Sequence, residues 1–194
     1  MIKRQFLAAL SAAALSLLAA CGQDKPAFKG VDITGADYAK GWELSDQHGQ
    51  VRTLKDFAGK VVVVFFGYTQ CPDVCPTSMQ ELAQVKQLLG PDGDKLQGVF
   101  ITIDPERDTP ARMAEYARAF PGLTALTGTP AQIAETAKAY AVFYSKQSPR
   151  PDGCYDMEHT RAAYLFDRGG KPIALLPTDK SAPEVAKELA KWVR

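Results

Sequence analysis

Two cysteines four residues apart are the residues whose types and spacing point most directly to chemistry. Cys71 and Cys75 follow the apolar run 61–66 and precede a stretch with helical periodicity. A rigid strand holds such a loop in place, and the amino end of a helix stabilises thiolates. The spacing of four puts both sulfurs on the same side of a helix or turn. Two such thiolates can close a disulfide or bind one metal ion.

The ligand chemistry of this pair calls for a third donor. Soft thiolates favour copper(I), with zinc as the other candidate, and two cysteines alone form a weak chelate. The chain contains two histidines. His48 lies in a polar turn, where we expect an exposed residue without a ligand role. His159 precedes an apolar strand, and its position alone leaves a metal ligand and a surface histidine equally open.

The amino-terminal residues have the pattern of a secretory leader. Lys3 and Arg4 precede the apolar run 6–20, which is shorter than the roughly twenty residues of a membrane-spanning helix. A cysteine directly after small residues resembles a bacterial lipobox. We therefore expect 1–20 to be a lipoprotein signal peptide and Cys21 to be lipidated, with an uncleaved membrane anchor as the alternative.

This leader sets the expected organisation of the rest of the chain. Residues 21–40 are predicted to be a tether, and 41–194 a single folded domain, a usual size for one core. Without the leader, the chain has 21 basic and 22 acidic side chains, and no basic block is present. Composition therefore argues against nucleic acid as a partner.

Export also changes the interpretation of the cysteines. Thiols outside the cytoplasm are normally oxidised, and the odd number left after Cys21 cannot all pair with one another. Cys154 lies in a Pro- and Gly-rich loop five residues before His159. We expect it to be a bystander thiol, with an additional ligand or a resolving thiol as the alternatives.

The elements that must position these residues alternate between strands and helices. The apolar run 61–66 predicts a central strand that is buried on both faces. The full expected set is a hairpin over 41–55, strands over 61–66, 99–103, 162–166 and 173–176, and helices over 77–89, 113–120, 133–140 and 185–193. This order predicts an α/β protein with a thioredoxin-like fold, in which helices flank a central mixed β-sheet and an N-terminal β-hairpin extends it.

Three ordered motifs carry a resemblance to a known family. The run 67–77, Gly-Tyr-Thr-Gln-Cys-Pro-Asp-Val-Cys-Pro-Thr, resembles the signature of the Sco/SenC copper proteins. The run 104–110, Asp-Pro-Glu-Arg-Asp-Thr-Pro, resembles their second motif, and His159 stands at the matching order and distance. The resemblance extends over about residues 41–192.

The resemblance implies a copper site and a role in assembly. It implies that Cys71, Cys75 and His159 bind Cu(I) or Cu(II), and that the two cysteines form a disulfide when oxidised. It further implies that the protein helps to assemble the binuclear copper centre of cytochrome c oxidase, as copper donor, as thiol reductant, or both. We therefore expect a metallochaperone rather than an enzyme with turnover.

The resemblance also implies partners and a location. The expected partners are the copper-centre subunit of cytochrome c oxidase and a periplasmic copper chaperone or thioredoxin-like reductant. The expected location is the bacterial cell envelope, on a membrane through the lipid anchor, facing the periplasm or the cell exterior.

Two other functions stay open from the sequence. A thiol–disulfide oxidoreductase acting on partner cysteines would need no histidine. A thiol peroxidase is the weakest alternative, because Thr69 lies two residues before Cys71 and no Thr-x-x-Cys pattern is present. Asp73 is expected to be a solvated turn carboxylate or to face a partner. Asp104 and Asp108 are expected to accept backbone N–H bonds, and a role beside the metal for Asp104 or Arg107 is the alternative.

Overall fold

The apolar run after Lys60 forms the central strand of the molecule. Strand β4 (Val61–Gly67) is buried along its whole length, as its Val and Phe residues predict. It pairs in parallel with β5 (Leu96–Thr102) and antiparallel with β9 (Ala163–Phe166). These neighbours cover both edges of β4, so the cysteine loop that follows it starts from the centre of the fold.

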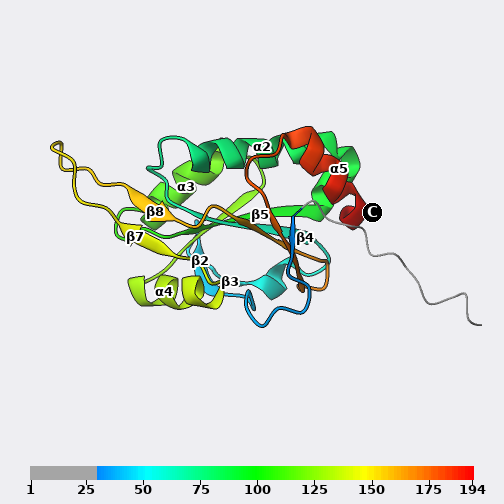
Figure 1. Ribbon diagram of the computed structural model, residues 1–194, viewed down its shortest axis with the longest axis horizontal. Coiled ribbons are helices and arrows are strands. Elements are labelled where there is room, and N and C mark those ends of the chain that lie inside the picture. Colours follow the sequence, from blue (N-terminus) through cyan, green and yellow to red (C-terminus); the bar gives the residue numbers. More distant parts are fainter. Residues whose placement is uncertain (1–29) are drawn as a thin grey trace, which may run out of the picture.

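The computed structural model describes residues 30–194, in which β4 belongs to an eight-stranded mixed sheet (Figure 1). The strand order is β1-β10-β9-β4-β5-β6-β2-β3. The remaining strands are β1 (Val31–Asp32), β2 (Glu43–Asp46), β3 (Val51–Thr53), β6 (Leu123–Thr127) and β10 (Pro172–Leu176). Strands β7 (Tyr144–Lys146) and β8 (Met157–His159) form a separate two-stranded ribbon.

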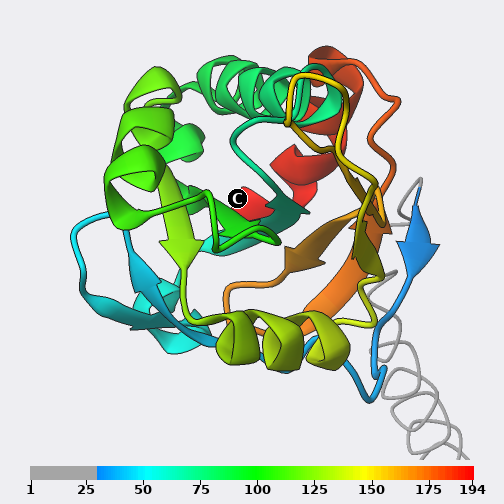
Figure 2. The same cartoon turned by 90° about the vertical axis from the view of Figure 1, so that its left-hand side faces the viewer.

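Helices lie on both faces of the large sheet. The α-helices are α2 (Val74–Leu88), α3 (Pro110–Ala119), α4 (Pro130–Ala139) and α5 (Ala182–Val193), and the short helices are η1 (Leu54–Phe57) and η2 (Gly90–Lys95). The crossovers from β4 to β5 and from β5 to β6 run in the same direction, which places α2 and α3 on one face. Helix α5 packs against α2, and α4 lies on the opposite face (Figure 2). This arrangement confirms the expected mixed sheet with helices on both faces.

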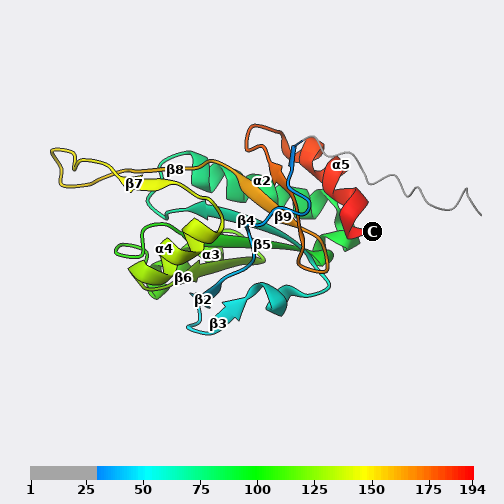
Figure 3. The same ribbon diagram turned by 60° about the horizontal axis from the view of Figure 1, so that its bottom comes forward.

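The ribbon of β7 and β8 stands apart from the sheet. Its connecting loop, residues 147–156, projects from the body of the molecule in both Figure 1 and Figure 3. This ribbon was not predicted from the sequence, where we expected a loop before a strand. Its strands are three residues long and mostly polar, so they carry no apolar alternation.

The expected element boundaries are correct at the centre of the fold and wrong at several ends. The hairpin over 41–55 is confirmed as β2 and β3, and the last two strands and the closing helix are confirmed as β9, β10 and α5. Helix α2 begins at Val74 rather than at 77, because Pro76 is tolerated in a first turn, where the N–H groups need no helical partner.

Strand β6 was not predicted, because its Leu-Thr-Ala-Leu-Thr run is short and its Leu and Ala residues are strong helix formers.

The folded part also begins earlier than expected. Residues 31–40, expected to belong to the tether, contribute β1 at the edge of the sheet and the buried side chains of Ile33 and Ala39. The expected leader and Cys21 lie outside the described residues. Between residues 30 and 194, no helix is both long and apolar enough to span a membrane.

Candidate functional site

Three segments meet at one end of the central sheet. The loop after β4 carries Cys71, and the loop after the parallel strand β5 carries Asp104 and Arg107. Strand β9 runs antiparallel to β4, with Ala163 opposite Phe65, so the residues just before β9 reach the same end. The carboxyl ends of parallel strands are where α/β proteins commonly place their sites. The topology thus brings His159 to the cysteine loop.

The two cysteines differ in exposure. Cys71 lies in the turn before α2 and is partly exposed, whereas Cys75 lies in the first turn of α2 and is fully buried. The Cys75 backbone N–H donates to Cys71 Sγ at 3.5 Å. Gly67, at the end of β4, makes room for the buried sulfur, because a Cβ there would lie 2.8 Å from Cys75 Sγ. The sulfurs therefore lie on the same side, as the spacing predicts.

The hydrogen bond between the two cysteine side chains shifts their pKa values in opposite directions. The Cys75 thiol donates to the Cys71 sulfur, and this bond lowers the pKa of Cys71 to about 3 against the opposing effect of burial. The same donation and burial raise the pKa of Cys75. At neutral pH the pair therefore holds a partly exposed thiolate and a buried thiol.

His159 presents one ring nitrogen to the buried cysteine. Its Nε2 lies 3.8 Å from Cys75 Sγ, and its Nδ1 lies 3.0 Å from the Thr160 carbonyl oxygen. A carbonyl oxygen can only accept, so this contact places a proton on Nδ1 and leaves the Nε2 lone pair of the neutral ring toward the sulfur. A second hydrogen bond of this kind is typical of metal-binding histidines.

Two aromatic rings fix the plane of the imidazole. Phe65 and Tyr68 each meet the His159 ring edge to face, with ring centroids 6.2 Å apart in both pairs. The contact of Tyr68 with His159 ties β8 to the cysteine loop. Sequence reasoning missed these contacts, although both aromatic residues belong to the strand and loop that precede Cys71.

Asp108 anchors the cysteine loop to the end of β5. Its carboxylate accepts the Thr69 backbone N–H at 3.0 Å, the Thr69 hydroxyl at 2.6 Å and the Thr102 hydroxyl at 2.7 Å. The expected backbone acceptor role is therefore confirmed for Asp108. The carboxylate of Asp104 instead accepts from the side chains of Arg107 and Tyr155, so the expectation for Asp104 was wrong.

The other sequence candidates lie outside this cluster. His48 is exposed in the β2–β3 turn, and Asp73 is exposed at the start of α2 without a side-chain cap. Cys154 is exposed in the loop of the β7–β8 ribbon, where its backbone N–H donates to Asp152. Cys71, Cys75 and Cys154 are all unbridged.

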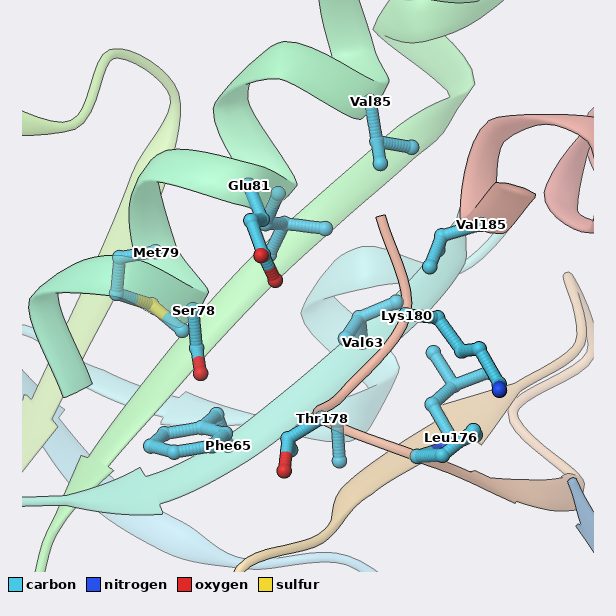
Figure 4. Close-up of a pocket in the computed structure, with 13 residues that line it drawn as sticks. Val63, Phe65, Ser78, Met79, Glu81, Val85, Leu176, Thr178, Lys180 and Val185 are labelled. Carbon is cyan, nitrogen blue, oxygen red and sulfur yellow. The ribbon is translucent and has the colours of Figure 1, made fainter. Parts of the chain in front are cut away.

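An apolar cavity lies beside the site and opens to solvent. Figure 4 shows it between β4, α2, α5 and the segment from Leu176 to Lys180, with Ser78, Glu81 and Thr178 among its lining residues. Its one sulfur is the thioether of Met79, and no histidine lines it. The thiolate and imidazole donors therefore lie next to this cavity rather than inside it.

Relatives of known structure share this architecture. The copper-bound ScoI of Bradyrhizobium japonicum is 43% identical to the chain, with a TM-score of 0.72 over 78% of this chain and 97% of that one. Copper-bound yeast Sco1 is 31% identical, with a TM-score of 0.72 over 79% and 86% of the two chains. These similarities confirm the thioredoxin-like fold.

The sequence relatives and a family model agree with the structural ones. The mitochondrial SCO2 homolog of mouse is 37% identical over 155 residues, which are 78% of this chain but 61% of the mouse protein. A SCO2-like protein of Rickettsia conorii is 35% identical over 150 residues, or 76% and 73% of the two chains. The chain thus spans about three fifths of its mouse relative. The SCO1/SenC family model matches residues 31–194, and the chain belongs to that family.

Proposed function

We propose that the chain binds copper through Cys71, Cys75 and His159. The observation that carries this proposal is the 3.8 Å separation between His159 Nε2 and Cys75 Sγ. Bonds of about 2.3 Å to sulfur and about 2.0–2.1 Å to nitrogen, as at zinc, separate two ligands of one trigonal or tetrahedral ion by about 3.5–3.8 Å. The distance therefore fits two ligands of one metal ion.

Cys71 completes the donor set. Among residues 30–194, no three His, Cys, Asp or Glu side chains already surround a metal-sized position. Cys71 is partly exposed in a turn, so its sulfur has the freedom to turn toward the other two donors. Two thiolates suit copper(I), and an added imidazole also suits copper(II). Only reduced thiols bind metal, so a Cys71–Cys75 disulfide would switch binding off.

The biological role follows from this site and from the family. Sco proteins similar in fold are cytochrome c oxidase assembly proteins, and two relatives of this chain hold copper. In our proposal copper is the cargo, delivered to the copper-centre subunit of cytochrome c oxidase. A periplasmic copper chaperone or a thioredoxin-like reductant would act before this step. Open access at Cys71 supports transfer by exchange of ligands.

A second candidate function rests on the unequal acidity of the two thiols. The Cys71 thiolate can attack a disulfide of a partner and form a mixed disulfide, which releases one partner thiolate. Cys75 then loses its proton and attacks Cys71 Sγ, which releases the second partner thiolate and leaves Cys71–Cys75 oxidised. In this reaction the chain acts as a two-electron reductant of the partner cysteines.

The proposed location rests on the leader pattern. Removal of residues 1–20 and lipidation of Cys21 would anchor the domain to a membrane of the cell envelope, facing the periplasm or the cell exterior. The tether between Cys21 and β1 would then be about ten residues long.

Titration of the reduced protein with Cu(I) and with Cu(II) tests the copper proposal. His159→Ala should weaken Cu(II) binding and remove the thiolate-to-Cu(II) charge-transfer band, while the Cys71–Cys75 disulfide should still form. His48→Ala is the matched control for removing a histidine, and Cys154→Ser should keep the copper stoichiometry. An unchanged affinity and spectrum in His159→Ala would exclude the proposed ligand set. The dithiol reduction potential, measured in parallel, tests the reductase role separately.

A further inference from the structure

One loop holds the base of the β7–β8 ribbon. Arg107, in the loop after β5, donates from Nη1 to the Tyr155 carbonyl oxygen at 2.9 Å and to Gln70 Oε1 at 3.2 Å. Its guanidinium carbon lies 3.5 Å from the centroid of the Tyr155 ring, a close cation–π contact. Asp104 accepts from the Tyr155 hydroxyl at 3.0 Å and from Arg107 Nε.

These contacts are largely shielded from water. The side chain of Arg107 is 16% exposed and that of Asp104 is 4% exposed. The nearby pair of Lys146 and Glu106 also joins the loop to the ribbon, but its side chains are 49% and 64% exposed. Exposed ion pairs contribute little, whereas breaking a shielded pair is costly. The Arg107 contacts are therefore the more costly of the two to break.

The position of Arg107 links the two halves of the proposed metal site. Gln70 directly precedes Cys71, and Tyr155 lies four residues before His159. Among the described residues, β7 and β8 pair only with each other. The orientation of the ribbon relative to the sheet is therefore set by side-chain contacts rather than by a shared ladder of backbone hydrogen bonds.

We propose that Arg107 is a positioning residue that holds the His159 ribbon in reach of the cysteine loop. This inference rests on the proposed copper site. Its planar guanidinium reaches Asp104, Gln70 and Tyr155 at once, which the ammonium of a lysine cannot do in the same geometry. Arg107 thus supports the imidazole-dependent state of the site, while the two thiolates stay in place on the loop and α2.

The test is Arg107→Lys, which keeps the positive charge but removes the planar set of N–H donors of the guanidinium. Outer residues that orient metal ligands typically change metal affinity about 10–100-fold when they are replaced. We expect Cu(II) affinity to fall in that range with a weaker charge-transfer band, and Cu(I) affinity to stay close to wild type. Arg150→Lys is the matched control, because Arg150 lies on the same ribbon but is 50% exposed. Tyr155→Leu should act like Arg107→Lys, because it removes the ring and the hydroxyl that Arg107 and Asp104 contact while Arg107 itself is unchanged.

A metal-free measurement separates this inference from the copper proposal. In the metal-free protein, Arg107→Lys should raise amide hydrogen exchange in β7 and β8 but not in β4 or α5. If the wild type binds no Cu(II), the copper proposal fails while the exchange result still tests the positioning role. If Arg107→Lys and Tyr155→Leu both keep the wild-type hydrogen exchange and the wild-type ratio of Cu(II) to Cu(I) affinity, the positioning role of Arg107 is overturned. Equal loss of both affinities, with faster exchange throughout, would show a general structural role instead.

Discussion

At the residue scale, the central feature is that the side chains of Cys71 and Cys75 differ in exposure and in pKa. Cys71 is partly exposed and accepts hydrogen bonds, while Cys75 is buried and donates one. His159 lies beside the buried sulfur, with its proton held on the other ring nitrogen by Thr160. The Cys71 thiolate can therefore react or bind a metal directly. Cys75 loses its proton only when its sulfur binds a metal or forms a disulfide.

This difference predicts an unusual pH dependence of alkylation. The pKa of Cys71 is lowered to about 3, because the Cys75 thiol hydrogen-bonds its sulfur. The thiolate is present above that pKa and is lost only as pH falls through it. The iodoacetamide rate at Cys71 should therefore be nearly constant between about pH 5 and pH 8, whereas glutathione, an ordinary thiol, gains about tenfold per unit.

The measurement uses the Cys154→Ser protein, which removes the exposed thiol in the ribbon loop, and peptide mass spectrometry to locate the label. Cys75 should stay unlabelled because it is buried. A rate at Cys71 that rises tenfold per pH unit over this range would show that the thiolate is not stabilised.

At the element scale, the site depends on how closely β4 and α2 approach each other. Gly67 ends β4 directly behind Cys75, and a Cβ at Gly67 would lie 2.8 Å from both Cys75 Sγ and Phe100 Cε2. Both neighbours are fully buried, so neither can move away without cost. The glycine is therefore required by the close packing of the sulfur rather than by its backbone conformation.

Gly67→Ala should destabilise the protein and disturb the metal site together. Forcing an extra methyl into a packed core costs about 1–3 kcal/mol, measurable by urea unfolding, and the displaced sulfur should weaken Cu(I) binding. Val62→Ala is the control, because it leaves a cavity in the same strand but is remote from the sulfur. Wild-type copper affinity in Gly67→Ala would show that the packing does not position Cys75.

The same scale shows what the sequence could and could not predict. Long apolar patterns, such as Val61–Gly67 and the closing helix, predicted their elements well, and the cysteine spacing predicted their shared side. The short ribbon that carries His159 has no such periodicity, so it was missed. The contact of His159 with the Thr160 carbonyl could not be predicted either, because a backbone acceptor leaves no mark in the sequence.

At the scale of the whole molecule, the chain enters the sheet at the same end as the site. Val31 pairs with Leu175, and the next residue of β10, Leu176, pairs with Ala163, which in turn pairs with Phe65. Phe65 contacts the His159 ring. In our proposal, a lipid anchor on Cys21 would therefore join the domain at the end of the sheet where Cys71, Cys75 and His159 lie.

The anchor makes a prediction that distinguishes the two interpretations of the leader. Intact-mass spectrometry of the membrane-associated protein should show a chain that begins at a lipid-modified Cys21. Cys21→Ser should abolish this modification, because the serine cannot form the thioether link to the lipid. An unmodified mass that includes residues 1–20 would instead establish an uncleaved membrane anchor.

The most direct test of the central claim is the X-ray absorption spectrum of the copper-loaded protein. The proposed site predicts two sulfur ligands and one imidazole nitrogen in the wild type. His159→Ala should lose the imidazole signal and keep both sulfurs, while His48→Ala should match the wild type. A spectrum without two sulfurs, or an imidazole signal that survives in His159→Ala, would contradict the account.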